Sequence, residues 1–404
     1  MSGYLPDDQD ELAAAQGGAD PRATASSAGA GVPARPPPDP LQDARQEQAA
    51  PARRVRAAWF TTQATLDQFA MVLQPLAVGL LDELVDVTVV CRHGVDIGQL
   101  PSPPVGVIRH GRLNWLFLRT AAMRNLAGEL RSRKIELIHA LDAASASAGD
   151  QAARRIDSPL VVSSLRLGDG RLLGSAGQRA SAVLAASQPI REDLLAGRAA
   201  APERLHLVRP GVYHVRHATC FDNPSCSASI VAGGSLDDFQ AFGTVLRSLR
   251  NLQAGKHDCS LFILGAGRAE RALRALADKL GLRSVLTFVG TQRPEQLLEI
   301  YKAADLYVAA TAGATVDVQA LLAMAAGVPV IAAAGGACDF LIDAQTAEVF
   351  PRGDCQRLTD ELVRLLEDHA AARAMAERAL EYVAKAHSPA GMVGAVADIY
   401  RQSL

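Results

Sequence analysis

The chain has 404 residues, of which 49% are hydrophobic and 21% charged, and its net charge is −2. These values are typical of a globular protein with room for two domains. The charge gives no reason to expect nucleic acid or a general anionic membrane as a partner. The sequence has no apolar run of about 18 residues, so we expect no transmembrane segment.

Six cysteines are scattered along the chain, and none forms a CxxC pair or has a histidine at zinc-finger spacing. We therefore expect free thiols and no metal. The acidic N-terminus lacks the apolar stretch of a secretory signal. Together these features predict a cytoplasmic protein.

Residues 1–52 differ in composition from the rest of the chain. They are rich in Ala, Pro, Gly, Gln and Asp, carry PARPPPDP at 33–40, and contain almost no large apolar side chains. Such a segment cannot bury enough surface to offset the entropy lost on ordering, so we predict a disordered tail. A docking role for this tail, toward a protein partner, stays open.

From Val55 onward, short β-like runs alternate with helical ones, which predicts parallel β–α–β units and a doubly wound sheet. The first domain is expected over 53–213, with helices at Thr65–Leu84 and near 114–131 and 188–197. Its expected strands are Val55–Phe60, Val85–Val90, Ile135–His139, Leu160–Leu165, Ala182–Ala186 and Leu205–Val208.

A second alternating series is expected over 228–386, after a linker at 214–227 that lacks periodicity. Pro294 suits the first turn of one helix, and Asp354 is the expected N-cap of another. Two doubly wound domains facing across a cleft are therefore predicted. The expected strands of the second domain are Ala228–Ala232, Leu261–Leu264, Val285–Val289, Leu306–Ala309, Val328–Ala332 and Glu348–Phe350.

Three segments follow one another in a recognisable order: FVGTQRPEQLLEIYKAADLYVAAT at 288–311, ALLAMAAGVPVIAAAGG at 320–336, and FPRGD at 350–354. This succession resembles the donor-binding domain of the family 4 (group 1) glycosyltransferases. KIELIHALDAASASAGD at 134–150 and LHLVRPGVY at 205–213 are similar to parts of the same family's first domain. The likeness covers nearly all of 55–404.

The resemblance implies the GT-B fold, with two Rossmann-like domains and a closing helix at 387–404 that returns to the first domain. It also implies a retaining transfer of sugar from a nucleotide-sugar donor, without a metal, to an unknown glycan or lipid-linked acceptor.

The family's functional positions are altered in this chain. Its Glu-x7-Glu pair falls on Ala314 and Leu322, neither of which has a side chain able to accept a hydrogen bond. The family's Arg and Lys, which contact the diphosphate, fall on Ser235 and Gln240. Loss of charge-assisted bonds of this kind weakens diphosphate binding by roughly 1.5–3 kcal/mol each. Asp237 and Asp238 add negative charge nearby, and Asp317 is the only acid near the altered pair.

Two elements of the family's first domain are altered as well. Its histidine falls on Leu165, followed by Arg166, and its glycine-rich loop is replaced by TTQATLDQF at 61–69. No catalytic residue is therefore assigned. One hypothesis is a glycosyltransferase whose activity is weak or lost, and the alternative is a non-catalytic pseudoenzyme that acts as a binding or partner subunit.

Candidate donor-binding residues remain in two glycine turns. Gly265, Gly267 and Arg268 follow a strand, and their backbone amides could hold a phosphate at a helix N-terminus. A structural strand-to-helix turn is the other interpretation. Gly335 and Gly336 follow a later strand and could lie against the donor, or simply make a tight turn.

Several charged residues are further candidates. Arg293 falls where the family often contacts the base, although a solvated surface position explains it equally. Arg166, Arg209 and Arg268 could replace the lost cations. His139 ends a predicted strand in the cleft, where a structural role is the alternative to a base.

Overall fold

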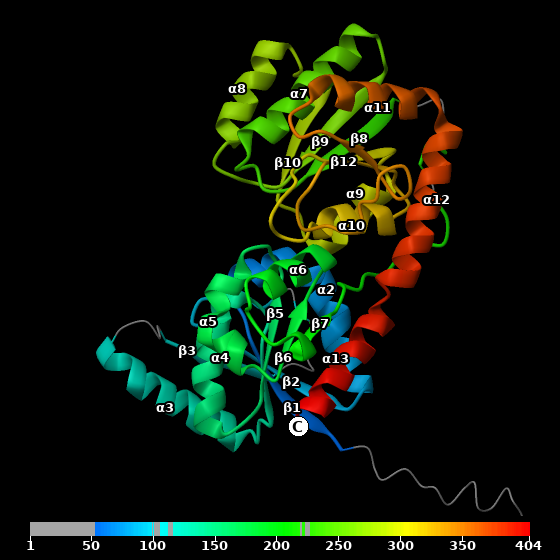
Figure 1. The fold of residues 1–404 in the computed structure, drawn as a ribbon. Coiled ribbons are helices and arrows are strands. Elements are labelled where there is room, and N and C mark those ends of the chain that lie inside the picture. The colour runs from blue at the N-terminus through cyan, green and yellow to red at the C-terminus, as the bar shows by residue number, and fades with distance from the viewer. Residues whose placement is uncertain (1–52, 99, 101–105, 112–115, 219, 223–226) are drawn as a thin grey trace, which may run out of the picture. The chain divides into compact units, whose positions relative to one another are not determined.

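The computed structural model describes residues 53–98, 100, 106–111, 116–218, 220–222 and 227–404. The predicted disordered tail at 1–52 lies outside these residues, as do parts of the predicted linker and the first positions of the helix expected near 114–131. Residues from Ala52 onward belong to one compact unit. Within it the strands form two parallel sheets, each flanked by helices (Figure 1).

The first sheet has seven strands in the order β3-β2-β1-β4-β5-β6-β7, and all neighbours are parallel. One of them, β3, was not predicted, because its five residues GVIRH show neither alternation nor a continuous apolar run. The strands are β1 (Val55–Phe60), β2 (Val85–Arg92), β3 (Gly106–His110), β4 (Leu137–Ala140), β5 (Leu160–Ser164), β6 (Ala182–Ala185) and β7 (Leu205–Leu207).

Five α-helices connect these strands, and two of them escaped prediction. The buried face of α4 consists of Ala, Ser and Gly with one Asp, so it lacks the large apolar periodicity that marks a helix in a sequence. The helix α5 is interrupted at Gly174, whose φ is 47°. The helices are α2 (Gln63–Asp82), α3 (Leu116–Ser132), α4 (Ala143–Ile156), α5 (Asp169–Arg179) and α6 (Gln188–Ala196), with a 3-10 turn at Pro202–Arg204.

The second sheet has six strands in the order β10-β9-β8-β11-β12-β13, again all parallel. Every strand predicted for this half is present, with ends shifted by two residues or fewer. The strands are β8 (Ala228–Gly233), β9 (Cys259–Leu264), β10 (Leu286–Gly290), β11 (Leu306–Ala309), β12 (Val330–Ala333) and β13 (Glu348–Phe350).

Two helices of the second half begin where Pro294 and Asp354 predict them. The side chain of Asp354 accepts a hydrogen bond from the amide of Arg357 at 2.9 Å, and Pro294 occupies the first turn of α9. The helices are α7 (Phe239–Ala254), α8 (Glu270–Leu280), α9 (Pro294–Lys302), α10 (Val318–Ala325), α11 (Cys355–Glu367) and α12 (His369–Ala386). Two parallel Rossmann-like sheets confirm the predicted α/β fold class.

The last helix, α13 (Pro389–Ser403), packs beside α2 of the first half (Figure 1). Its Tyr400 is fully buried, and the hydroxyl lies 2.9 Å from Trp59 Nε1 and 2.6 Å from His139 Nδ1. Since an indole N–H can only donate, the Tyr400 oxygen accepts from Trp59, while the donor in the bond to His139 depends on the tautomer of the imidazole. This chain of bonds ties the C-terminal helix to β1 and β4.

The helix α2 is long and apolar enough to cross a membrane by length and composition. More than half of its most apolar stretch is buried inside the protein, and Pro75 lies within it. Burial against β2 and α13 is the behaviour of a core helix.

Candidate functional site

A pocket of about 570 Å³ lies at the carboxyl ends of β8, β9 and β10. In doubly wound sheets ligands bind at the carboxyl ends of the strands, beside the point where the strand order reverses, which here lies between β8 and β11. The turns after the three strands line it with Gly234, Ser235, Gly265, Ala266, Thr291 and Gln292. Side chains of α2, α9 and the start of α10 complete the wall, namely Ala64, Asp67, Gln68, Ala70, Met71, Leu297, Asp317, Val318, Gln319 and Leu322.

The glycines after β9 are required by close packing of two turns. A Cβ on Gly265 would lie 2.0 Å from the carbonyl oxygen of Gly234, and φ at Gly265 is +118°. A Cβ on Gly267 would lie 2.3 Å from the carbonyl carbon of Leu236. The amide of Gly265 already donates to the carbonyl of Gly290 at 3.0 Å. The geometry therefore gives these glycines a structural role, and a phosphate contact at Gly265 and Gly267 stays a prediction.

Arg268 is held by an acid of its own domain. Its backbone amide donates to Asp237 Oδ1 at 2.8 Å, and its Nε lies 3.3 Å from the same oxygen. The hydrogen bond from this amide is the main reason that the pKa of Asp237 is lowered. The Arg268 side chain is 92% exposed and does not line the pocket. The predicted donor contact of Arg268 therefore competes with an internal carboxylate.

The other candidate arginines also lie outside the lining of this pocket. Arg209 forms an ion pair with Asp339 at 2.8 Å, and Arg166 is part of an isolated β-bridge with Thr315. Arg293 precedes α9, where its backbone amide donates to Gln296 Oε1 at 3.1 Å. A contact between Arg293 and a base stays a prediction.

The glycine pair after β12 packs against the backbone of the segment 312–313. A Cβ on Gly336 would lie 2.7 Å from the carbonyl oxygen of Gly313, at a φ of +87°. The next residue, Ala337, donates its amide to the same carbonyl at 3.0 Å. Gly335 has a φ of +95° and no close neighbour. The structure supports the tight-turn interpretation for Gly336, and donor contact by the pair is untested.

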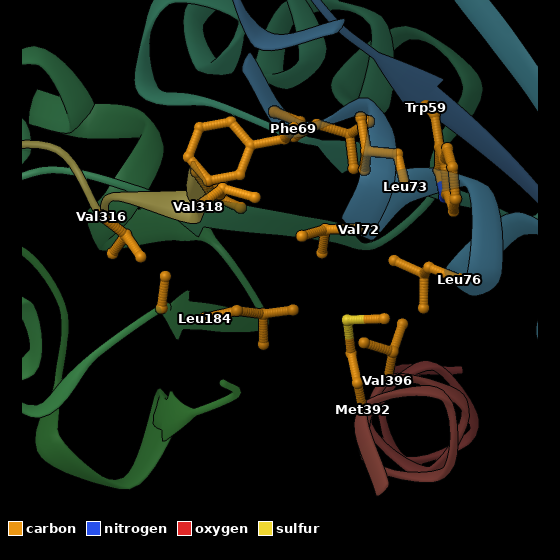
Figure 2. Close-up of a cluster of buried hydrophobic side chains, with 14 of the residues drawn as sticks. Trp59, Phe69, Val72, Leu73, Leu76, Leu184, Val316, Val318, Met392 and Val396 are labelled. Carbon is orange, nitrogen blue, oxygen red and sulfur yellow. The ribbon is translucent and has the colours of Figure 1, made fainter. Parts of the chain in front are cut away.

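The segment 313–318 bonds to the first half of the chain. The amide of Leu167 donates to the carbonyl of Ala314 at 2.8 Å, and the amide of Val316 donates to Leu165 at 3.1 Å. Figure 2 shows Val316 and Val318 in a buried apolar cluster with side chains of both halves. Other labelled members are Trp59, Phe69, Val72, Leu73, Leu76, Leu184, Met392 and Val396.

Asp317 is the acid of this segment, and it caps α10. Its Oδ1 accepts from the amides of Gln319 at 3.0 Å and Ala320 at 3.1 Å. Burial raises the pKa of Asp317 to about 6, although these two bonds act in the opposite direction. A carboxyl group with such a pKa can hold or release a proton near neutrality.

Gln319 reaches toward the turn after β8. A Cβ on Gly233 would lie 2.2 Å from Gln319 Oε1 and 2.6 Å from the Tyr307 hydroxyl, so a side chain is excluded there. The Oε1 atom of Gln319 is buried and accepts no hydrogen bond from the described residues. Behind it Tyr301 and Tyr307 pack edge to face, with ring centroids 5.6 Å apart.

His139 has a structural environment. It is 1% exposed and lies between Tyr400 and Ser163, with Nε2 2.8 Å from the serine hydroxyl. Burial lowers its pKa to about 3, which keeps the imidazole neutral at physiological pH. It lines a separate, mostly apolar cavity of about 60 Å³ in the first half. The structural alternative therefore fits His139 better than a role as base.

The altered family positions fall at different places. Ser235 and Leu322 line the pocket, whereas Ala314 is exposed and bonded to Leu167. Sequence reasoning did not find Asp67 or Gln319, although the V-D-V-Q pattern ahead of an apolar helix signals an N-cap. Among the described residues, no group of three His, Cys, Asp or Glu side chains could hold a metal ion, and the expectation of no metal stays a prediction.

Comparison with known proteins gives a family likeness for the second half. Residues 227–368 match the family model of "Glycosyl transferases group 1". A GDP-mannose-dependent monoacylated alpha-(1-6)-phosphatidylinositol monomannoside mannosyltransferase of Corynebacterium glutamicum is 30% identical over 132 residues, or 31% of this chain and 34% of the relative. A D-inositol 3-phosphate glycosyltransferase of Corynebacterium aurimucosum is 27% identical over 178 residues, or 42% of each chain.

These matches span between a third and a half of each relative's length. Solved structures extend the likeness beyond residues 227–368. Anabaena HepE in complex with UDP and glucose has a TM-score of 0.70 at 16% identity, over 86% of this chain and 100% of that chain. The sucrose-phosphate synthase of Thermosynechococcus elongatus has a TM-score of 0.70 at 20% identity, over 86% and 99%. At such identities the likeness shows the fold alone, and that fold is GT-B.

Proposed function

We propose that this chain is a group 1 glycosyltransferase in which transfer of sugar from a nucleotide sugar is weak or lost. The names of the relatives, a GDP-mannose-dependent mannosyltransferase and inositol phosphate glycosyltransferases, support the ancestral reaction. They also support a glycan or lipid-linked acceptor for any activity that remains. The chemistry of the pocket supports the loss.

The observation that carries the proposal is the charge of the pocket. No Lys, Arg or His side chain is among the described residues that line it, whereas Asp67 and Asp317 are. A diphosphate held without cations lacks charge-assisted bonds, each contributing roughly 1.5–3 kcal/mol. The same cations would stabilise the leaving nucleotide in the transition state, so their loss costs rate as well as affinity.

Packing of the segment 313–318 supports the same conclusion. The first position of the family's acid pair is Ala314, and its carbonyl is engaged by Leu167 rather than turned to a ligand. The neighbouring Val316 is fully buried in the apolar cluster of Figure 2. Ala314 itself is exposed, and its methyl group offers no acceptor to a donor hydroxyl.

A slow transferase is the second candidate, and Asp317 favours it. This carboxyl group lines the pocket and has a pKa of about 6. A group of that kind is suited to exchange a proton with a sugar hydroxyl near neutral pH. A non-catalytic binding or partner subunit is the limiting case in which no transfer remains.

The test is an assay of nucleotide release from UDP-glucose, UDP-N-acetylglucosamine and GDP-mannose by the full chain, with and without sugar acceptors. The inositol phosphate glycosyltransferase of C. aurimucosum, supplied with its acceptor, serves as the working control. We expect no release above the protein-free rate. Turnover within tenfold of the control enzyme would refute the proposal.

A gain-of-function variant sharpens the assay. Ser235→Arg with Gln240→Lys returns cations to the positions that the family resemblance assigns to the diphosphate. We expect tighter UDP binding in this double variant. Because Ala314 and Leu322 would still lack acids, we expect transfer to remain slow.

A further inference from the structure

We propose that the pocket at the ends of β8, β9 and β10 binds an uncharged polyhydroxylated ligand, a monosaccharide or cyclitol, in preference to a nucleoside diphosphate. This inference rests on the proposed function, because it names the ligand class of the same site. A volume of about 570 Å³ is within the range of small-molecule pockets.

The polar lining suits hydroxyl groups. Its side chains are carboxylates, amides and hydroxyls from several elements: Asp67, Gln68, Ser235, Thr291, Gln292 and Gln319. A carboxylate only accepts hydrogen bonds, while an amide both donates and accepts. A sugar or cyclitol hydroxyl also does both, so each can pair with either kind of group.

The charge of the lining discriminates against phosphate. Asp67 and Asp317 are the charged side chains among the described lining residues, and both are acids. Arg268, which follows the turn at 265–267, is already bonded to Asp237 and is not among the lining residues. A ligand that brings two negative charges would therefore face repulsion and desolvation without compensation.

The side-chain oxygen of Gln319 is an acceptor that has no donor among the described residues. Its Oε1 is buried and accepts no hydrogen bond from the described residues, yet the residue lines the pocket. This atom has no solvent-accessible surface, so a ligand donor reaches it when the Gln319 side chain turns toward the pocket, and pairing then removes the cost of an unpaired buried acceptor. A hydroxyl group is such a donor, whereas an ionised phosphate is not.

An apolar side of the same pocket suits the C–H face of a sugar ring. Met71, Leu297, Val318 and Leu322 line it. Leu322 stands where the family resemblance implies an acid, so apolar contact has replaced a charged one at that point. Polar groups with an apolar wall are the usual make-up of a ligand site.

The test is a binding titration of the full chain, followed by saturation-transfer NMR and calorimetry. Glucose, galactose, mannose, N-acetylglucosamine and myo-inositol are compared with their phosphates and with UDP and GDP. We expect at least one neutral compound to saturate, and UDP and GDP to bind at least tenfold more weakly. UDP or GDP binding as tightly as every neutral compound, or no saturation by any neutral compound, would overturn the inference.

The variant Gln319→Leu tests whether the ligand binds in this pocket, because leucine is similar in size to glutamine but has no hydrogen-bond acceptor. We expect the affinity for the neutral ligand to fall at least tenfold, with unchanged thermal unfolding in its absence. Gln356→Leu is the matched control, since Gln356 is an exposed residue of α11 that pairs with Asp360. Equal affinity in the two variants would overturn the assignment to this pocket.

The same samples show separately whether the proposed function fails and whether the ligand-class inference fails. Nucleotide release from a nucleotide sugar at the rate of the working control contradicts the proposed function alone. The affinity ranking of free sugars against UDP and GDP, together with the Gln319→Leu result, decides the ligand class.

Discussion

Asp237 binds Arg268 twice, through the backbone amide at 2.8 Å and the guanidinium Nε at 3.3 Å. The amide belongs to the turn that leads into α8, where an anionic ligand would be received in a phosphate-binding strand–turn–helix unit. An internal carboxylate therefore occupies donors that a diphosphate would need. The pair adds to the backbone hydrogen bonds that join the loop after β8 to the turn after β9.

Replacing Asp237 should free the backbone amide and the guanidinium Nε of Arg268 to bind a phosphate. We expect Asp237→Ala to raise the affinity for UDP by at least about tenfold, because charge-assisted hydrogen bonds contribute roughly 1.5–3 kcal/mol each. Calorimetric titration with UDP measures the change. Asp278→Ala is the matched control, since it breaks a similar exposed pair with Arg283 in the same half. Equal UDP affinity in both variants would show that Arg268 does not receive phosphate.

Gly336 should tolerate a side chain less well than another glycine with the same backbone. Gly336 and Gly353 have φ values of +87° and +81°, but only a Cβ on Gly336 meets backbone, 2.7 Å from Gly313 O. Both alanine variants lose about 1–2 kcal/mol from the left-handed conformation. We expect Gly336→Ala to lose more than Gly353→Ala in urea unfolding. Equal losses would mean that the turn moves freely away from 312–313.

Removal of the Tyr400 hydroxyl should destabilise the first half. Tyr400→Phe leaves the Trp59 indole N–H and His139 Nδ1 without their partner in a fully buried site. We expect a loss of about 1–3 kcal/mol in the free energy of unfolding. Tyr213→Phe is the control, because Tyr213 is 68% exposed. A loss for Tyr400→Phe no larger than for the control would contradict the buried chain of hydrogen bonds.

Asp317 should make stability fall as pH rises. Its pKa is about 6 when folded against 3.8 as its ordinary value, so the folded state binds the proton more tightly. The contribution of Asp317 to stability is therefore fully present below about pH 4 and is lost as the pH rises through 6. Asp317→Asn keeps an N-cap acceptor and removes the charge. We expect it to stabilise the protein at pH 8 by at most about 3 kcal/mol, with little effect at pH 4.

The matched control for Asp317 is Asp354→Asn at the N-cap of α11. Asp354 is exposed and accepts a hydrogen bond from the amide of Arg357 at 2.9 Å. Because its carboxylate is solvated, we expect no gain in thermal stability at pH 8 for this variant. A gain equal to that of Asp317→Asn would show that burial is not the cause.

Local spacing was enough for most of the fold. Strands such as Leu306–Ala309 are continuous apolar runs bounded by polar residues, as buried parallel strands are. Helices with large apolar residues at helical spacing, or with a capping Asp, were predictable for the same reason. The helix α4 could not be predicted in this way. Its buried face is made mostly of Ala, Ser and Gly, which show no hydrophobic periodicity in the sequence.

The candidate site was less predictable than the fold. The glycine turn at 265–267 was visible as a motif, and the positions at which the family resemblance implies charged groups could be counted along the chain. The bonds between Asp237 and Arg268 could not be predicted, since the two residues lie 31 positions apart and are brought together only by the pairing of parallel strands.

The sequence therefore established the two Rossmann-like halves, because they depend on residue type and short-range spacing. Tertiary structure alone decided the surroundings of the candidate residues. It buries Val316 between the halves, raises the pKa of Asp317 to about 6, and leaves Gln319 Oε1 buried without a hydrogen-bond partner among the described residues. Burial and electrostatics depend on neighbours from distant segments, which no local pattern contains.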